Sequence, residues 1–384
     1  MLENNDDGLQ SLTQCNDAII PTVKKRRMDI DLLRIFACFF VLFNHTRGYQ
    51  AFAHTDSQIM MWFCSSLSVI TKTAVPLFYM ISGAMLFSDK QESYQVIIKK
   101  RVLRVAVVIP FLTAMLAAIG AFRGYISTFS FDVCFRMTLR GADEVGGMPY
   151  WYLYWYIGML LMLPFYRRMA KNMTKQDFYM LFFLYFFFNT FMQLLDMILT
   201  ANNILPFAIH SDFKLGLNFA LTTTVFFPLA GYYLDHNVDL LKISKKKLYS
   251  LFASGIAGIA VTCWLKAREL EENGMEFTEN YISLFGCVIT ISIFLFIKYI
   301  CAKFNQFENH EKFVKAVTLA GSLAYGMYIF DPFMKWVVYS RFVALISPDT
   351  YMIYPNIIYC LLSMSVCGSF TMLLRRIPVI KKLV

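Results

Sequence analysis

Long apolar segments alternate with short polar stretches along almost the whole chain. A segment of this kind forms a membrane-spanning helix when it contains about 20 predominantly apolar residues. The pattern therefore predicts an all-α polytopic membrane protein with about ten transmembrane helices. The ten segments cover residues 30–52, 60–88, 102–122, 150–166, 178–200, 216–234, 248–266, 280–302, 316–340 and 351–374.

The second segment is long and contains residues that favour a bend. Pro76 has no backbone N–H to donate, and Ser82 and Gly83 are small. Sharp bends in helices occur at such residues, and small residues also let two helices approach closely. We therefore expect a bent helix in close contact with a neighbour, and Ser82 is a candidate for contact with substrate.

Composition supports a membrane protein and excludes a soluble domain. Hydrophobic residues make up 58% of the chain and charged residues 16%, whereas charged residues make up about 25% of a soluble domain. The net charge is +10, and the charged residues lie mainly between the apolar segments, where they determine the topology. We therefore expect membrane lipid as a partner and no nucleic acid. The nine cysteines show no spacing typical of metal ligands, so no metal site is expected.

Lysine and arginine residues are concentrated in alternate loops. The positive-inside rule then places both termini in the cytoplasm of a multi-pass protein of the cell membrane. We expect a disordered cytoplasmic tail over 1–27, a membrane domain over 28–376 and a cytoplasmic tail over 377–384, since the N-terminal residues form no signal peptide. The basic clusters lie at 24–27, 90–104, 167–175, 242–247, 298–315 and 375–382.

Two titratable residues interrupt the first apolar segment. Arg34 and His45 are eleven positions apart, so at about 100° per residue they share one helical face and are separated by roughly 16 Å along the axis. Such residues are costly in a bilayer and are functional candidates. Arg34 could also extend to the inner interface as an anchor. His45 lies beyond the midplane and could act as a general base.

A second basic motif opens the third segment on the cytoplasmic side. Arg101 and Arg104 are three positions apart and therefore lie on the same face of a helix. Two guanidinium groups on one face suit bidentate binding of phosphate. The alternative is that both residues are topology anchors.

Aromatic residues mark two further candidate sites. The run 150–156 contains Trp151 and Tyr152 and forms either an aromatic belt at the lipid interface or a platform on which a sugar stacks. The ninth segment contains Tyr328 and Asp331. A carboxylate in an apolar segment is a functional candidate, and Asp331 could orient His45 or bind an acceptor hydroxyl. The loop carboxylates at 143–144 are alternatives for either role.

Together these motifs resemble the acyltransferase-3 family of integral-membrane acyltransferases, over roughly residues 25–375. The similar parts are the Arg34/His45 spacing, the Phe-Tyr-Met-Ile-Ser-Gly stretch at 78–83, the pair Arg101/Arg104 and the Gly-Met-Tyr-Ile stretch at 326–329. Members move acyl groups, usually acetyl from acetyl-CoA, onto carbohydrates or other extracytoplasmic acceptors. The resemblance implies that His45 is the catalytic base and that the three arginines serve the acyl donor. Many members have histidine where this chain has Asp331.

We therefore expect an O-acyltransferase that moves an acyl group, with acetyl as the expected one, from cytoplasmic acetyl-CoA to a carbohydrate or lipid-linked glycan. The alternative is a permease or flippase, which the absence of internal repeats disfavours; a third possibility is a sensory or scaffold domain. The catalytic candidates are His45 and Asp331, the donor-binding candidates are Arg34, Arg101 and Arg104, and the substrate-binding candidates are Ser82, Trp151, Tyr152 and Tyr328.

Overall fold

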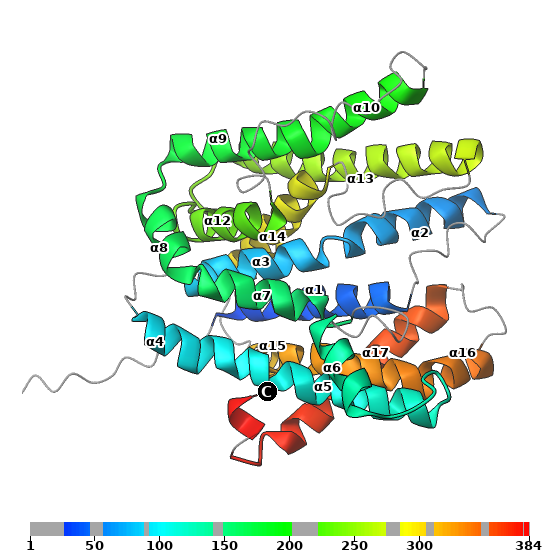
Figure 1. The fold of residues 1–384 in the computed structure, drawn as a ribbon. Coiled ribbons are helices and arrows are strands. Elements are labelled where there is room, and N and C mark those ends of the chain that lie inside the picture. Colours follow the sequence, from blue (N-terminus) through cyan, green and yellow to red (C-terminus); the bar gives the residue numbers. More distant parts are fainter. Residues whose placement is uncertain are drawn as a thin grey trace, which may run out of the picture.

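The computed structural model describes residues 27–46, 57–87, 92–140, 149–201, 222–273, 285–304, 311–346, 353–378 and 380–383. Within these ranges every regular element is a helix (Figure 1), which confirms the all-α prediction. The expected N-terminal tail up to residue 26 and the candidate loop carboxylates Asp143 and Glu144 lie outside the described residues.

The helices follow one another along the chain with short π-helical turns between some of them. The π-helical turns are Ile98–Val102, Phe187–Phe191 and Lys335–Tyr339, and a 3-10 turn covers Ile380–Lys382. The α-helices are α1 Met28–His45, α2 Gln58–Thr71, α3 Ala74–Leu86, α4 Tyr94–Ile97, α5 Leu103–Phe122, α6 Phe131–Leu139, α7 Trp151–Leu161, α8 Leu163–Asn172, α9 Lys175–Phe186, α10 Met192–Ala201, α12 Thr223–His236, α13 Lys245–Asn273, α14 Gly286–Phe304, α15 Glu311–Met334, α16 Ser340–Ile346 and α17 Ile353–Leu374.

Seven helical stretches among the described residues are long and apolar enough to cross a membrane, so the protein is a multi-pass membrane protein but the expected count of about ten is not confirmed. Three expected segments correspond to other helices. Helix α1 contains three charged residues, α7 has 11 residues and α12 has 14, whereas a full crossing needs about 20 apolar residues. The seven stretches are Gln58–Leu86, Tyr94–Phe122, Lys175–Leu195, Lys245–Ala267, Gly286–Phe304, Glu311–Ile346 and Ile353–Leu374.

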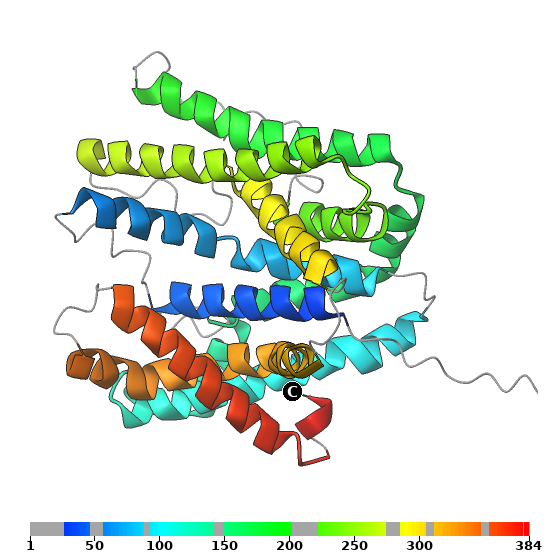
Figure 2. The same cartoon turned by 180° about the vertical axis from the view of Figure 1, so that it is seen from behind.

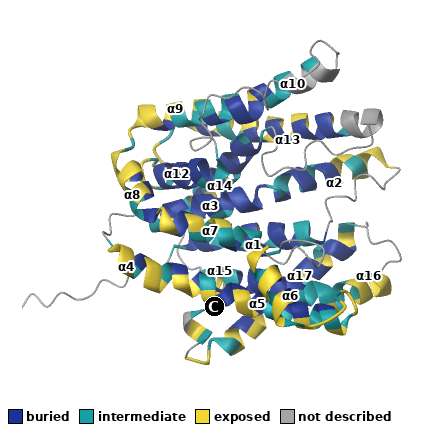
Figure 3. Ribbon diagram, viewed as in Figure 1, coloured by how far each residue is buried: buried dark blue, intermediate teal, exposed yellow. Residues whose placement is uncertain are grey.

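Helix α1 lies at the centre of the bundle. It packs against α3 on one side and against α15 and α17 on the other (Figure 1). From the opposite direction, Figure 2 shows α14 running obliquely between α13 and α1. Buried residues are concentrated in α3, α12 and α14 and in parts of α1 (Figure 3). A helix with this many neighbours can hold polar side chains that lipid would exclude.

The predicted bend of the second segment is present. Helix α2 ends at Thr71 and α3 begins at Ala74, so the break falls just before Pro76. The proline occupies the first turn of α3, where its missing N–H leaves no helical hydrogen bond unmade. Ser82 and Gly83 lie inside α3, so they do not form the bend.

Helices α3 and α12 touch through their backbones. A Cβ atom built on Gly83 would lie 1.8 Å from the carbonyl oxygen of Pro228, and one built on Gly231 would lie 2.2 Å from the carbonyl oxygen of Met80. Contact this close is possible only where both positions are glycine. The expectation that Gly83 allows close approach of a neighbouring helix is therefore confirmed.

We expect the variant Gly231→Ala to be clearly less stable than the wild type. The added methyl group meets the backbone of α3, which has no rotamer to change, and overpacking of this kind costs about 1–3 kcal/mol. The measurement is thermal unfolding in detergent. The matched control is Gly158→Ala, where no atom lies within 4 Å of the added Cβ. Equal unfolding temperatures for Gly231→Ala and the wild type would contradict this contact.

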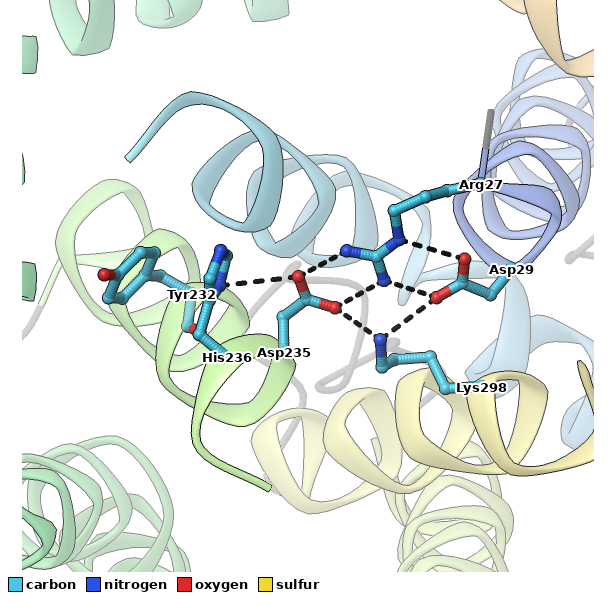
Figure 4. A network of polar contacts seen from close by, with 6 residues as sticks. All are labelled: Arg27, Asp29, Tyr232, Asp235, His236 and Lys298. Atoms are coloured by element: carbon cyan, nitrogen blue, oxygen red, sulfur yellow. Dashed lines mark hydrogen bonds and ion pairs between the residues drawn. The ribbon is translucent and has the colours of Figure 1, made fainter. Parts of the chain in front are cut away.

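An ion-pair network fixes the first residues of α1 (Figure 4). Arg27 donates hydrogen bonds of 2.6 Å to both carboxylate oxygens of Asp235, and it also donates to Asp29 at 2.5 and 3.2 Å. Lys298 donates to Asp29 at 3.0 Å and to Asp235. Because two cations face two carboxylates, the charges balance at a site where the Asp235 side chain is only 1% exposed. The network joins α1, α12 and α14 and so anchors the helix that carries Arg34 and His45.

Candidate active site

A cavity of about 720 Å³ opens beside α1. Its size lies within the range of about 300–1,000 Å³ that is typical of small-molecule sites. It is bounded by side chains of α1, α3, α5, α7 and α15, and eight of the nine candidate site residues from the sequence line it. They are Arg34, His45, Ser82, Arg101, Arg104, Trp151, Tyr152 and Tyr328.

The ninth candidate, Asp331, lies behind His45. The Nδ1 atom of His45 is 2.8 Å from Oδ2 of Asp331, and the Oγ atom of Ser363 donates a 2.8 Å hydrogen bond to the other carboxylate oxygen. The Asp331 side chain is 0% exposed, whereas that of His45 is 21% exposed and reaches the cavity. Of the two roles considered for Asp331, this geometry favours the orientation of His45.

The contact between His45 and Asp331 has a direct chemical consequence. An ionised carboxylate only accepts hydrogen bonds, so Nδ1 of His45 must carry the proton. The second ring nitrogen, Nε2, is then an acceptor that can take a proton from a hydroxyl group in the cavity. The arrangement is that of a general base with an orienting carboxylate.

A cluster of cations lines another part of the cavity. It contains the three predicted arginines and also Lys100 and Arg375. The sequence analysis missed these two because each lies in a basic cluster that the positive-inside rule already accounts for. Arg34 is paired with Asp31 at 3.0 Å, and Arg375 donates to the hydroxyl and carbonyl oxygens of Ser322. Five cations beside one cavity suit a ligand with several negative charges.

Arg101 and Arg104 share the cavity, as their spacing predicts, but their surroundings differ. Arg101 donates through Nε and Nη2 to the two carboxylate oxygens of Glu92, at 3.0 and 2.9 Å. The hydrogen bonds from Arg101, followed by that from Arg167, lower the pKa of Glu92. Arg104 is exposed, and within the described ranges no carboxylate pairs with it. Arg104 is therefore the more available of the two for an anionic ligand.

Aromatic rings also line the cavity, among them those of Tyr152, Tyr156 and Tyr328. The Tyr152 ring lies 5.3 Å from that of Tyr79 and is stacked at 6.0 Å on that of Tyr156, measured between centroids. Tyr328 lies 6.5 Å from the His45 ring. By contrast, Trp155 is 51% exposed and does not line the cavity. The aromatic run therefore places some of its rings on the cavity and Trp155 on the outer surface of the same helix.

Sequence reasoning also missed two polar residues, one that contacts Asp331 and one that precedes His45. Ser363 lies in α17, 32 positions after Asp331, and a serine in an apolar helix gives no sign of its partner. Asn44 lines the cavity next to His45. The sequence did contain a sign of Asn44, because an amide in an apolar segment is costly to bury without hydrogen-bond partners.

The chain matches a model of a known protein family. The family model described as an acyltransferase domain matches residues 28–374, which is nearly the whole chain. A search of curated proteins and a search of solved structures each found no match.

Proposed function

This chain belongs to the acyltransferase-3 family of membrane acyltransferases, and we propose that it moves an acyl group, acetyl in the first instance, from cytoplasmic acyl-CoA to a hydroxyl group of an extracytoplasmic or lipid-linked carbohydrate. One observation carries this proposal. A single cavity is lined both by a cluster of cations and by a histidine that a buried carboxylate orients. The first can bind phosphates and the second can activate a hydroxyl group.

The cations fit the phosphates of coenzyme A. Arg34, Lys100, Arg104 and Arg375 each line the cavity, and guanidinium groups bind phosphate oxygens with paired hydrogen bonds. From Arg34, the face of α1 leads to His45, roughly 16 Å further along the helix axis. A pantetheine arm lying along this face would bring the thioester to His45. The bound donor supplies an activated acyl group.

His45 performs the proton transfers in this proposal. Its Nε2 atom takes the proton of the acceptor hydroxyl as the oxygen attacks the acyl carbonyl carbon. When the carbon–sulfur bond breaks, His45 returns that proton to the departing sulfur, so an ester and a free thiol are formed. The aromatic side chains of Trp151 and Tyr152 would hold the acceptor. Transfer through a transient acyl-enzyme would use the same cavity and the same base.

The orientation in the membrane is also a proposal. Helices α4 and α8 lie on one side of the bundle (Figure 1), and the basic residues within 99–101 and 167–171 belong to that side. By the positive-inside rule this side faces the cytoplasm of the cell. The donor would then enter from the cytoplasm and the acceptor from the other side.

Transport is the second candidate function. A permease or flippase also needs polar residues inside a bundle, and the cavity would serve a small solute. The buried pairing of His45 with Asp331 favours catalysis, because it fixes a ring nitrogen as an acceptor. Acetyl-CoA distinguishes the two functions, since only an acyltransferase should bind it and release its thiol.

The test of the proposed function uses the whole protein in nanodiscs and in cells. We expect saturable binding of acetyl-CoA, and we expect mass spectrometry to find an acetylated surface glycan only in cells that make the protein. Identical glycan profiles, together with no binding of acetyl-CoA, would contradict the proposal.

We expect Arg104→Lys to weaken acetyl-CoA binding by roughly tenfold. Lysine keeps the charge but loses the paired geometry, and one charge-assisted hydrogen bond is worth about 1.5–3 kcal/mol. Arg101→Lys should have a smaller effect, because Glu92 already occupies two of its donor groups. The measurement is acetyl-CoA affinity in nanodiscs.

Arg168→Lys is the matched control for the arginine series. Arg168 is exposed in the basic helix α8 and does not line the cavity, so its replacement should leave the affinity unchanged. If Arg104→Lys also binds acetyl-CoA as the wild type does, Arg104 is a topology anchor and the donor site lies elsewhere.

A further inference from the structure

Acyl transfer requires more than a base. When an oxygen attacks a thioester, negative charge develops on the carbonyl oxygen, and fixed N–H or O–H donors that stabilise this charge make one of the largest contributions to catalysis. His45 transfers the proton but does not stabilise this negative charge. The hydroxyl of Tyr328, which lies near His45, already donates its hydrogen to the carbonyl oxygen of Pro149 at 2.8 Å. Stabilising the oxyanion therefore needs another hydrogen-bond donor, one with a hydrogen that no other acceptor takes.

Asn44 meets this requirement. It precedes His45 in the last turn of α1, and both residues line the cavity. Its Nδ2 atom donates a 2.9 Å hydrogen bond to the carbonyl oxygen of Thr71 in α2. An amide nitrogen carries two hydrogens, so one of them remains after this bond is made.

The orientation of the Asn44 amide is determined by its partners. The carbonyl oxygen of Thr71 can only accept a hydrogen bond, so the atom facing it must be the nitrogen. The hydroxyl of Thr71 lies 3.2 Å from Oδ1 of Asn44 and donates to it, a hydrogen that it shares with the carbonyl oxygen of Ser68 at 3.0 Å. Two contacts to one residue hold the amide rigid, and a rigid donor needs no reorganisation during the reaction.

We propose that Asn44 is a catalytic residue whose free amide hydrogen stabilises the oxyanion formed on the acyl carbonyl group while His45 moves the proton. This inference rests on the proposed acyltransferase function. It assigns separate tasks to two adjacent residues of α1. It also explains why an amide is held beside the base, at the point where α1 meets α2.

The test compares two variants of Asn44 in nanodiscs. We expect Asn44→Ala to lower kcat by about 10²–10³-fold, the range typical for loss of one oxyanion donor, while the Kd for acetyl-CoA stays within about twofold of wild type, because the interaction exists only in the transition state. Asn44→Asp keeps the shape and still accepts from Thr71 but has no amide hydrogen, and its kcat should fall at least as far.

Asn189 provides the matched control. Its Nδ2 atom also donates to a backbone carbonyl, that of Tyr185, at 3.1 Å, but Asn189 does not line the cavity. Asn189→Ala should therefore keep the wild-type kcat. Thermal unfolding of all variants separates a loss of stability from a loss of catalysis.

The outcomes are distinct. A kcat that falls in both folded Asn44 variants with an unchanged Kd supports the inference. A wild-type kcat in either folded variant overturns it, and so does a joint loss of kcat and acetyl-CoA affinity or a failure of both variants to fold, since Asn44 would then only tie α1 to α2. If the wild-type protein itself forms no acetylated product, the proposed function fails, independently of Asn44.

Discussion

Replacing His45 with alanine is expected to lower acyl transfer by about 10²–10⁴-fold, the usual cost of losing a general base. His45 reaches the cavity, and its Nδ1 atom is held 2.8 Å from Asp331, so the opposite ring nitrogen is the acceptor on the substrate side. The variant should still fold and bind acetyl-CoA, because the cations that face the donor are unchanged. The measurement is thiol release from acetyl-CoA with an acceptor present.

His236→Ala is the matched control for this variant. His236 also lies beside an aspartate, with Nδ1 3.4 Å from Asp235 (Figure 4), but it does not line the cavity. Its loss should leave turnover close to that of the wild type. Free imidazole should restore part of the activity of His45→Ala, since the cavity retains room for the missing ring. Wild-type turnover of His45→Ala would refute the assignment.

Replacing Asp331 with asparagine is expected to cost about 10²–10⁴-fold in turnover although the side chain keeps its shape. Ser363 donates to Oδ1 of Asp331, and it would donate in the same way to the oxygen of an asparagine. The amide nitrogen would then face His45 and donate to Nδ1. The proton of the ring moves to Nε2, and His45 is no longer able to take a proton from the acceptor.

The double variant Asp331→Asn/Ser363→Ala tests this explanation. Without the serine hydroxyl, the asparagine amide is free to turn its oxygen towards His45. The double variant should therefore be more active than Asp331→Asn alone, a reversal that simple loss of stability would not produce. Acetyl-CoA affinity should be unchanged in both. If Asp331→Asn retains turnover within severalfold of the wild type, Asp331 does not control the protonation of His45.

Much of the fold and site follows from local patterns in the sequence. Apolar segments required helices, because only a helix satisfies its own backbone in a bilayer. The spacing of Arg34 and His45 placed them on one face, and both line the same cavity. The spacing of Arg101 and Arg104 also placed them on one face, and both line this cavity. Gly83 indicated close packing, which the contact with Pro228 confirms. Each of these inferences depends on residues that are neighbours within one helix.

The expected count of about ten membrane crossings is not confirmed among the described residues. The expected segments at α1, α7 and α12 are not among the seven stretches of the described residues that are long and apolar enough to cross a membrane; α1 contains three charged residues and the other two have 11 and 14 helical residues. In α12, buried residues extend from Val225 to Leu234. Apolar residues that contact other helices and apolar residues that contact lipid give the same signal, so hydropathy alone did not distinguish them.

The sequence by itself determined that this protein is helical and membrane-embedded, that one helix presents both Arg34 and His45, and which residue types could bind phosphate or remove a proton. The tertiary structure decided which side chains from distant parts of the chain contact one another. His45 and Asp331 are 286 positions apart, Ser363 comes from another helix, and Glu92 joins Arg101 to Arg167. Helical periodicity relates only residues within about one helix length. Which distant side chains meet depends on how the helices pack, and packing is a property of the whole bundle.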